Sequence, residues 1–505
     1  MDSFLSRHVE KIAGALSCYD RVVITGTIPG ICYAEGMASY LSAHGIRIFD
    51  YPRWAEPFRD AIREDAERIA AQAGLEIEFV RKGPFRKEER VREILRERGG
   101  HPGLVHVFSA METCSTYRPW HDKKSHRTFL KYDKSKCLHY YFYFVHPEVG
   151  LCYLRVPTWA PFRLQFYFNG HNALAALLDR KGVGYSLLDN AFVECGDWNR
   201  AQVLADSLRP EKIHRILDRA VKQYCPALRQ FNPVRWSLMQ AEYATDVVFC
   251  RQKDLVHLYE ELSRTAIHSV KPDQVATFLG RKPHGGYQGE LGNNFSTRIE
   301  GTCIKHHMGK ASIKMYDKHG IVLRIETTTN DVSFFKHHRK VEHRDGTVSR
   351  EVASLRKSLY SLVDLRELLL AANRRYLDFL AAVDDPANAF RDLDKTSRPV
   401  KKNGRSFRGF NLFSGPDLDV FRALAEGGTN ISGFRNRDLQ HRLGVSARQA
   451  STLLKRLREH GLVKKIGGTF KYYLTALGRR VTAAGLKVRE MTLIPLLRGT
   501  LAPPP

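Results

Sequence analysis

The sequence predicts an α/β protein. Its body is expected to be mixed α+β, with several small sheets and helices, followed by a C-terminal domain of short helices and a hairpin. Three observations support this fold class: strand and helix patterns alternate in 1–100, strand patterns dominate at 104–170 and 296–328, and amphipathic helices precede a hairpin signal after 416. A chain of 505 residues with 43% hydrophobic residues can bury more than one core.

The first hundred residues predict a small α/β domain. Runs of apolar and β-branched residues indicate strands, and the segments between them carry apolar residues at helical spacing. Strands that alternate with helices in this way are typical of a small sheet covered by helices. The expected strands are 21–27, 46–51 and 75–80, and the expected helices are 36–44, 55–73 and 87–98.

Residues 101–392 predict the mixed α+β body, with two antiparallel β units at 104–170 and 296–328. A basic, Trp-containing loop is expected at 117–127, and helices dominate the pattern over 171–265 and 351–383. The expected strands are 104–109, 138–144, 151–156, 163–168, 296–305, 311–316 and 321–328. Residues 393–415, rich in Arg, Lys, Ser, Asn and Gly, indicate a basic linker to the domain at 416–490.

The C-terminal pattern predicts a winged helix-turn-helix domain. A short amphipathic helix at 436–443 is followed by Gly444 and then by Ser446, an N-cap residue for a second helix that extends to 460. Gly461 ends that helix where a positive φ is needed. Two short strand patterns separated by a Gly-Gly pair then form a hairpin signal, the wing.

Polar residues on one side of the second helix and on the wing are candidate DNA contacts. Side chains near the start of such a helix read base edges in the major groove, and those further along it or on the wing contact phosphates. An alternative interpretation is a basic helix and hairpin that only pack against their neighbours. The candidates are Arg448, Gln449, Thr452, Lys455 and Arg456 on the helix, and Lys464, Lys465 and Lys471 on the wing.

This domain resembles the winged-helix domain of MarR-type bacterial regulators. The likeness lies in residues 437–439, 446–457, 459–462 and 473–478, about one seventh of the chain. It implies a DNA-binding fold and no particular effector ligand. MarR-type proteins dimerise through helices that flank this domain, so a homodimer is among the expected states.

The charge distribution predicts a polyanionic partner. The net charge is +26, and residues 395–489 contain 21 Lys and Arg against 5 Asp and Glu. A local basic field of this kind attracts nucleic acid in a salt-dependent way. A membrane partner is not expected, because no apolar run approaches 18 residues. Nine scattered cysteines without a Cys-x-x-Cys pair, and no apolar leader, predict a cytoplasmic protein with reduced thiols.

Two strands in the body carry a second candidate nucleic-acid surface. Alternation places Lys314, Tyr316 and Lys318 on one face of their strand and Arg324 and Glu326 on one face of the next. The pattern resembles the Lys-x-Tyr-x-Lys and Leu-Arg-x-Glu strands of plasmid and phage replication initiator proteins, which implies contact with a DNA backbone. We expect this face to be exposed together with Lys305, above buried Ile313, Met315 and Ile325. A charged hairpin face joined by Lys–Glu pairs is the alternative.

Enzymatic phosphodiester cleavage is a second hypothesis. Glu242 and Asp246 are expected one helical turn apart, and Glu326 completes a candidate set of carboxylates for a divalent metal. No other cofactor is expected. Tyr316 is a candidate nucleophile by resemblance to rolling-circle initiators, but the His-hydrophobic-His metal strand of those enzymes is missing, and His306–His307 is a poor substitute because adjacent strand residues point to opposite faces.

Aromatic residues in the first β unit allow a third hypothesis, RNA binding by base stacking. The alternative, that these aromatic residues form a core, is the more common use of such strands. The residues concerned are Tyr140, Tyr141, Phe142, Tyr143, Phe144, Tyr153, Trp159, Phe166, Tyr167 and Phe168.

Taken end to end, the chain also resembles a bacterial protein family to which no activity is assigned, through 137–144, 152–171, 265–280 and 298–331. That likeness implies a bacterial setting and a link to mobile elements. The sequence therefore predicts a DNA-binding protein that acts on plasmid or mobile-element DNA, in the manner of an initiator or a transposition protein. Metal-dependent DNA cleavage and RNA binding remain the alternatives.

Overall fold

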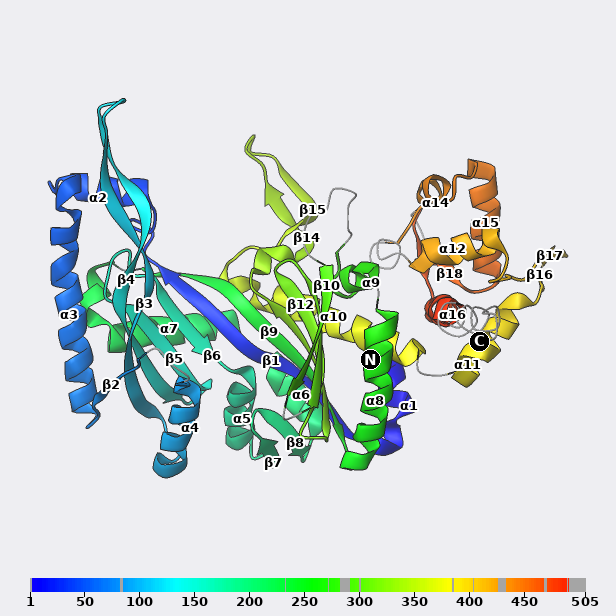
Figure 1. Ribbon diagram of the computed structural model, residues 1–505, viewed down its shortest axis with the longest axis horizontal. Helices are drawn as coiled ribbons and strands as arrows, with labels where there is room; N and C mark the ends of the chain where they lie inside the picture. The colour runs from blue at the N-terminus through cyan, green and yellow to red at the C-terminus, as the bar shows by residue number, and fades with distance from the viewer. Residues whose placement is uncertain are drawn as a thin grey trace, which may run out of the picture. The chain divides into compact units, whose positions relative to one another are not determined.

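In the computed structural model, the chain is described over residues 2–487 and 489, apart from 82–84, 232, 271, 282–290, 299–300, 384–385, 403, 426–432 and 467–469. The chain divides into two compact units. The hairpin unit comprises Leu16–Tyr243 and Thr329–Glu367, and the C-terminal unit comprises Met1–Ala15, Ala244–Thr328 and Leu368–Pro505. The fold is mixed α+β, as expected (Figure 1).

One eleven-stranded sheet replaces the several small sheets that the sequence predicted for the body. β2 pairs with β3 in parallel, whereas β3, β4 and β5 pair antiparallel, so the sheet is mixed. Small two-stranded sheets accompany it. In hydrogen-bonded order the large sheet contains β10 (Leu291–Arg298), β11 (Gly301–Met308), β12 (Ala311–Lys318), β13 (Val322–Thr329), β9 (Arg235–Phe249), β1 (Ile12–Thr27), β6 (Leu164–Phe168), β5 (Gly150–Pro157), β4 (Arg127–His146), β3 (Gly103–Asp122) and β2 (Ile77–Phe79).

The hairpin unit is built on the aromatic strands. Phe142, Tyr143, Phe166 and Phe168 are buried, so these aromatic residues form a core and do not offer a stacking surface. Its helices are α2 (Ala34–Ala43), α3 (Tyr51–Gln72), α4 (Lys87–Arg98), α5 (Gly170–Lys181), α6 (Trp198–Asp206) and α7 (Pro210–Tyr224). Its small sheets pair β7 (Tyr185–Leu188) with β8 (Ala191–Cys195) and β14 (Lys336–Glu342) with β15 (Val348–Ser354).

Two expectations for the hairpin unit are wrong. Residues 46–51 form no strand: a 3₁₀ turn, Ile48–Asp50, leads directly into α3, whose first turn contains Pro52. Proline is well tolerated in the first turn of a helix because its missing N–H would have no partner there. The expected loop at 117–127 is instead the outer end of a long hairpin, in which β3 and β4 pair as far as Asp122 and Arg127.

The C-terminal unit contains a separate hydrophobic core around its last helices. Phe421, Leu439, Leu454 and Leu457 are among the buried residues of this core. The helices of the unit are α1 (Asp2–Arg7), α8 (Gln252–Ser269), α9 (Pro272–Phe278), most of α10 (Leu362–Val383), α11 (Pro386–Ser397), α12 (Gly415–Ala425), α14 (Asn436–Leu443), α15 (Ala447–Glu459) and α16 (Ala476–Lys487). Short hairpins pair β16 (Val400–Lys402) with β17 (Arg405–Phe407) and β18 (Val463–Lys465) with β19 (Tyr472–Leu474).

Candidate functional site

Local sequence signals determine the arrangement of α14 and α15. Gly444 adopts the left-handed conformation, with φ of 64°, and so ends α14 where a side chain would be strained. The Ser446 hydroxyl caps α15 by accepting a hydrogen bond from the backbone N–H of Gln449. Gly461, with φ of 72°, follows α15 and precedes the β18–β19 hairpin. The helix, turn, helix and hairpin therefore occur in the expected order.

The α15 helix has one apolar and one polar side. Ala450, Leu454 and Leu457 are buried in the core. Arg448, Gln449, Thr452 and Lys455 are exposed on α15, as are Lys464 and Lys465 on β18, and Lys471 is half-buried. Exposure gives these candidate DNA contacts access to a large ligand, whereas the sequence alone could give only their spacing.

Gln449 has a structural task that the sequence analysis did not assign to it. Its side-chain oxygen accepts a hydrogen bond from the backbone N–H of Ser446 at 2.9 Å, which completes a capping box. The Thr452 hydroxyl likewise donates to the Arg448 carbonyl at 3.0 Å. Among the candidate DNA contacts on α15, Arg448 and Lys455 are therefore the ones with long exposed side chains.

Arg456 is not on the exposed side of α15, which corrects the sequence interpretation. Its guanidinium group donates to both carboxylate oxygens of Asp417, at 2.8 and 2.9 Å, and to the carbonyls of Arg408 and Gly409. It also lies 3.7 Å from the ring centroid of Phe410. Burial alone would raise the pKa of the Asp417 carboxyl group, but the hydrogen bonds from Arg456 and from the backbone N–H of Asn411 hold it below its ordinary value.

The expected linker is also revised by these contacts. Val400–Lys402 and Arg405–Phe407 form the β16–β17 hairpin, and the Arg408 carbonyl is bound by both Arg456 and His460. Phe410 is buried in the same core as α15. The described part of 393–415 therefore packs on the C-terminal helices.

The polar face of β12 and β13 is largely internal. Ile313, Met315 and Ile325 are buried, as expected, but Arg324 is also fully buried. Its guanidinium group forms two hydrogen bonds of 2.6 Å with Asp246. The expectation of an exposed basic surface that includes Arg324 is therefore wrong.

β12 and β13 instead contain the Lys–Glu pairing of the alternative interpretation. Lys314 donates to Glu326 at 2.5 Å, and the Tyr316 hydroxyl donates to the other Glu326 oxygen at 2.9 Å. Lys305 lies opposite Lys314 in the β11–β12 pairing and is half-buried, while Lys318 is buried. Lys314 and Tyr316 therefore form a polar network around the Glu326 carboxylate and do not present an open phosphate-binding face.

Glu242 and Asp246 lie on a strand, β9, and not on a helix. A spacing of four residues also puts two side chains on one face of a strand, so the two carboxylates still share a face. Their surroundings differ. Asp246 is buried and forms an ion pair with buried Arg324, whereas Glu242 is only half-buried. The helical assignment failed because β9 lies in the interior of the large sheet, where apolar residues occupy both faces.

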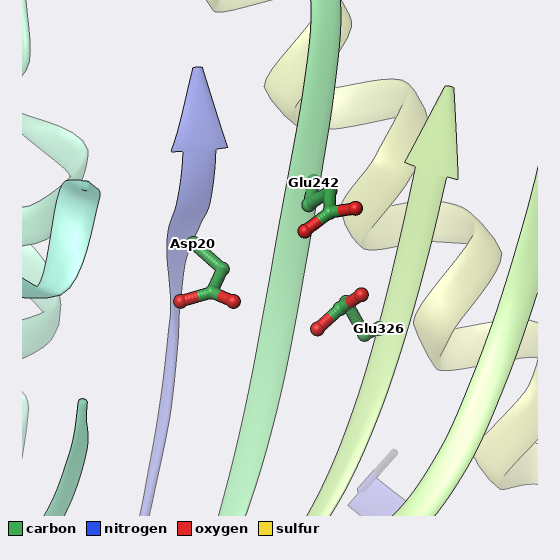
Figure 2. A group of neighbouring side chains, drawn as sticks. All are labelled: Asp20, Glu242 and Glu326. Atoms are coloured by element: carbon green, nitrogen blue, oxygen red, sulfur yellow. The ribbon is translucent and has the colours of Figure 1, made fainter. Parts of the chain in front are cut away.

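Three carboxylates from β1, β9 and β13 form a group that could hold a metal ion. One ligand atom from each of Asp20, Glu242 and Glu326 lies within 4.8 Å of the others (Figure 2). Glu242 and Glu326 were predicted from the sequence as metal ligands, but Asp20 was not. The available signal was a carboxylate within the apolar run 16–24, which is costly to bury without partners.

Polar side chains hold Asp20 in place. Asn190 and Asn169 donate to one Asp20 oxygen at 2.6 and 3.1 Å, and His171 Nδ1 lies 3.0 Å from the same atom. Asn169 in turn caps α5 by accepting from two backbone N–H groups. An all-oxygen set of carboxylates suits a hard divalent cation such as Mg²⁺ or Mn²⁺.

The histidine pair in β11 does not form a metal site of its own. His306 is buried and its Nε2 lies 2.9 Å from the Tyr376 hydroxyl, while His307 points to the opposite face of the strand. Burial lowers the pKa of His306 to about 4. The neutral His306 ring, hydrogen-bonded to Tyr376, therefore has a structural role and is not a metal ligand.

Comparison with protein-family models, with curated proteins and with solved structures finds no match to this chain. Within the described residues, no helix is long and apolar enough to cross a membrane. The interpretation of the sites therefore depends on their own geometry.

Proposed function

We propose that the protein binds duplex DNA through its C-terminal region, that this region is a winged helix-turn-helix domain, and that the DNA belongs to a bacterial plasmid or mobile element. The observation that carries the proposal is the division of α15 into a buried apolar side and an exposed side with Arg448 and Lys455. A helix anchored on one side and basic on the other can enter a major groove. The bacterial and mobile-element setting rests on the sequence resemblances alone.

Within this domain, the residues divide into base-reading and phosphate-binding groups. Arg448 lies in the first turn of α15, the part that faces base edges in helix-turn-helix docking, and an arginine reads guanine with two hydrogen bonds. Lys464 and Lys465 are exposed on the hairpin, where a wing contacts the backbone. Gln449 contributes mainly through the capping box, which keeps the start of α15 in a fixed conformation.

Selection of bound sequences from a random duplex library, followed by anisotropy titration with the full chain, tests this proposal. Arg448→Ala should weaken binding to the selected site by roughly 1–3 kcal/mol and leave random duplex nearly unaffected. Lys464→Ala with Lys465→Ala should weaken both duplexes and lower the salt slope by about two units. Arg422→Ala on α12, which removes an exposed charge elsewhere in the region, is the matched control. Equal behaviour of the control and both test variants would refute the proposal.

A second candidate function, metal-dependent phosphodiester cleavage, is favoured by the carboxylate group. We propose that Asp20, Glu242 and Glu326 hold one or two divalent cations. When bound, such a cation supplies Lewis-acid activation of a phosphate and of a water nucleophile. Lys314 and Tyr316 act as positioning residues because both contact Glu326, and His171 and the two asparagines do the same for Asp20.

Cleavage and metal binding can be measured separately. Mn²⁺ binding is followed by electron paramagnetic resonance, and nicking of supercoiled plasmid by gel electrophoresis with Mg²⁺ or Mn²⁺. Asp20→Asn and Glu242→Gln should lose both activities, whereas Glu211→Gln, an exposed carboxylate on α7, should keep both. If the unaltered protein takes up no Mn²⁺ in the millimolar range and leaves the plasmid intact, this second candidate is wrong.

A further inference from the structure

The hairpin of β3 and β4 extends beyond the sheet as a two-stranded ribbon (Figure 1). β5 pairs with β4 only over His139–His146, and β2 pairs with β3 only over Ile77–Phe79 and Val107–Ser109. Tyr117 and Leu130 are still buried, but the residues beyond them are mostly exposed. We call residues 118–131 the β3–β4 tip. The face that carries Trp120 and Phe129 is exposed, whereas Leu130 on the opposite face is buried.

Cationic residues dominate the composition of the tip. Residues 118–131 contain five Lys and Arg against one Asp, together with two histidines. The four residues at its turn are Lys123, Lys124, Ser125 and His126, and all are exposed. This charge attracts a polyanion and repels a second copy of the same ribbon. The four turn residues themselves include no apolar side chain that could insert into a lipid bilayer.

One face of the tip carries a pair of exposed aromatic residues between cations. Trp120 and Phe129 are directly opposite each other across the ribbon, and they are 42% and 41% exposed. Arg118 and Lys131 form the next pair on the same face, with their charged groups 5.4 and 5.3 Å from the Trp120 ring centroid. Exposed aromatic residues next to cations are the arrangement that binds nucleobases and the phosphates that link them.

We infer that the β3–β4 tip binds unpaired nucleic acid, with bases stacked on Trp120 and Phe129 and phosphates bound by Arg118 and Lys131. A duplex would need only the cations, because its bases are already stacked on one another. Two adjacent aromatic side chains instead fit two successive unpaired bases, whatever their sequence. This inference goes beyond the proposed function, since it concerns a different unit of the chain and a single-stranded ligand.

Anisotropy titration of fluorescein-labelled dT20 and of the equivalent RNA with the full chain tests the inference. Trp120→Ala and Phe129→Ala should each weaken binding by about 5-fold or more, since stacking on one aromatic side chain contributes at least that factor. Trp120→Phe, which keeps a stacking ring, should restore most of the affinity. Phe79→Ala, which removes an aromatic residue of the same unit that is 51% exposed, is the matched control and should change nothing.

The cations provide an independent readout. Arg118→Gln with Lys131→Gln should lower the single-strand salt slope by about 1.4 units, since each contact contributes about 0.7. The control Lys212→Gln with Lys222→Gln, two exposed lysines on α7, should leave the slope unchanged. Binding of duplex DNA by the C-terminal region should persist in Trp120→Ala, which separates the two proposals.

Two results would overturn the inference. One is unchanged affinity for dT20 and for the RNA in the double variant Trp120→Ala, Phe129→Ala, with thermal unfolding confirming that the variant is folded. The other is binding of the tip to anionic lipid vesicles, lost in that variant, without binding to either single strand. A preference between the DNA and RNA strands would identify the ligand more closely.

Discussion

Replacing Arg456 by alanine should destabilise the C-terminal region and leave its phosphate contacts intact. Arg456 and Asp417 are almost fully buried, and the guanidinium group makes four hydrogen bonds, two with the carboxylate and two with backbone carbonyls. Removal of one partner from a buried pair leaves the other charge without compensation, which costs about 3–5 kcal/mol. Arg408, 3.4 Å from the same carboxylate, offsets part of that cost, so we expect a loss near the lower figure.

Local proteolysis is the suitable assay, because a chain of several units need not unfold in one step. In the native protein the Arg408 carbonyl is bound by Arg456 and His460, so trypsin should cut slowly after Arg408. Arg456→Ala should accelerate cleavage there by about 100-fold if the opening free energy falls by about 3 kcal/mol. Arg458→Ala, which changes an exposed arginine of the same helix, is the control.

The pH dependence of stability, measured by thermal unfolding, gives a second test. Because the folded-state pKa of Asp417 is below its ordinary value, the pair contributes stability above the unfolded pKa, about 3.9, and loses it as the pH falls toward the folded pKa. Asp417→Asn should remove that acid-dependent component. The reasoning fails if Arg456→Ala keeps normal resistance to trypsin but lowers the salt slope of DNA binding by about one unit, which is the behaviour of an exposed phosphate contact.

The remaining predictions concern residues whose structural tasks differ from their expected ones. Arg324→Ala should lower the free energy of unfolding by about 3–5 kcal/mol in urea titrations, because Asp246 would stay buried without its partner; a folded variant that has lost only nucleic-acid affinity would contradict this. His306→Gln should reduce the loss of stability between pH 6.5 and about 4, because the unfolded chain takes up a proton in that range and the buried ring does not. Thermal unfolding across that pH range measures the effect. A pH dependence unchanged from that of the parent protein would refute the prediction. Ser446→Ala should destabilise α15 by about 1 kcal/mol through loss of its cap, visible as faster amide exchange at the start of the helix; unchanged exchange there would contradict the capping role.

Local signals explain why the C-terminal helices and hairpin could be predicted from the sequence. Ser446, Gly444 and Gly461 each determine a helix boundary through a backbone preference that depends on a few neighbouring residues. The strands of the first β unit were predicted for the same reason, although β3 and β4 extend further than the pattern indicated. The sequence could not predict that Arg448 is exposed and Arg456 buried, because the burial of Arg456 depends on its long-range contact with Asp417.

The candidate metal site depended on long-range pairing, which the sequence pattern does not contain. Glu242 was selected for its spacing of four residues from Asp246, and Glu326 to complete a carboxylate set, but Asp20 lies more than two hundred residues away from either. Its place in the group follows from the strand order β13–β9–β1, in which the neighbours are not consecutive in the chain. Periodicity predicts which face of a strand a residue occupies and gives no information about which strand lies beside it.

The contacts of Asp392, Leu393, Phe410 and Leu412 with the last helices determine which fragment can be studied in isolation. Leu393 and Leu412 pack against the core that contains Phe410, and Arg480 on α16 forms an ion pair with Asp392 on α11. A fragment that begins at 416, where the sequence pattern places the domain, would lack these residues and would leave Arg456 without two of its carbonyl partners. A fragment expressed for crystallisation or NMR should therefore begin at or before Pro386. A shorter fragment that aggregates or fails to fold would do so because it lacks Leu393, Phe410 and Leu412 of the core.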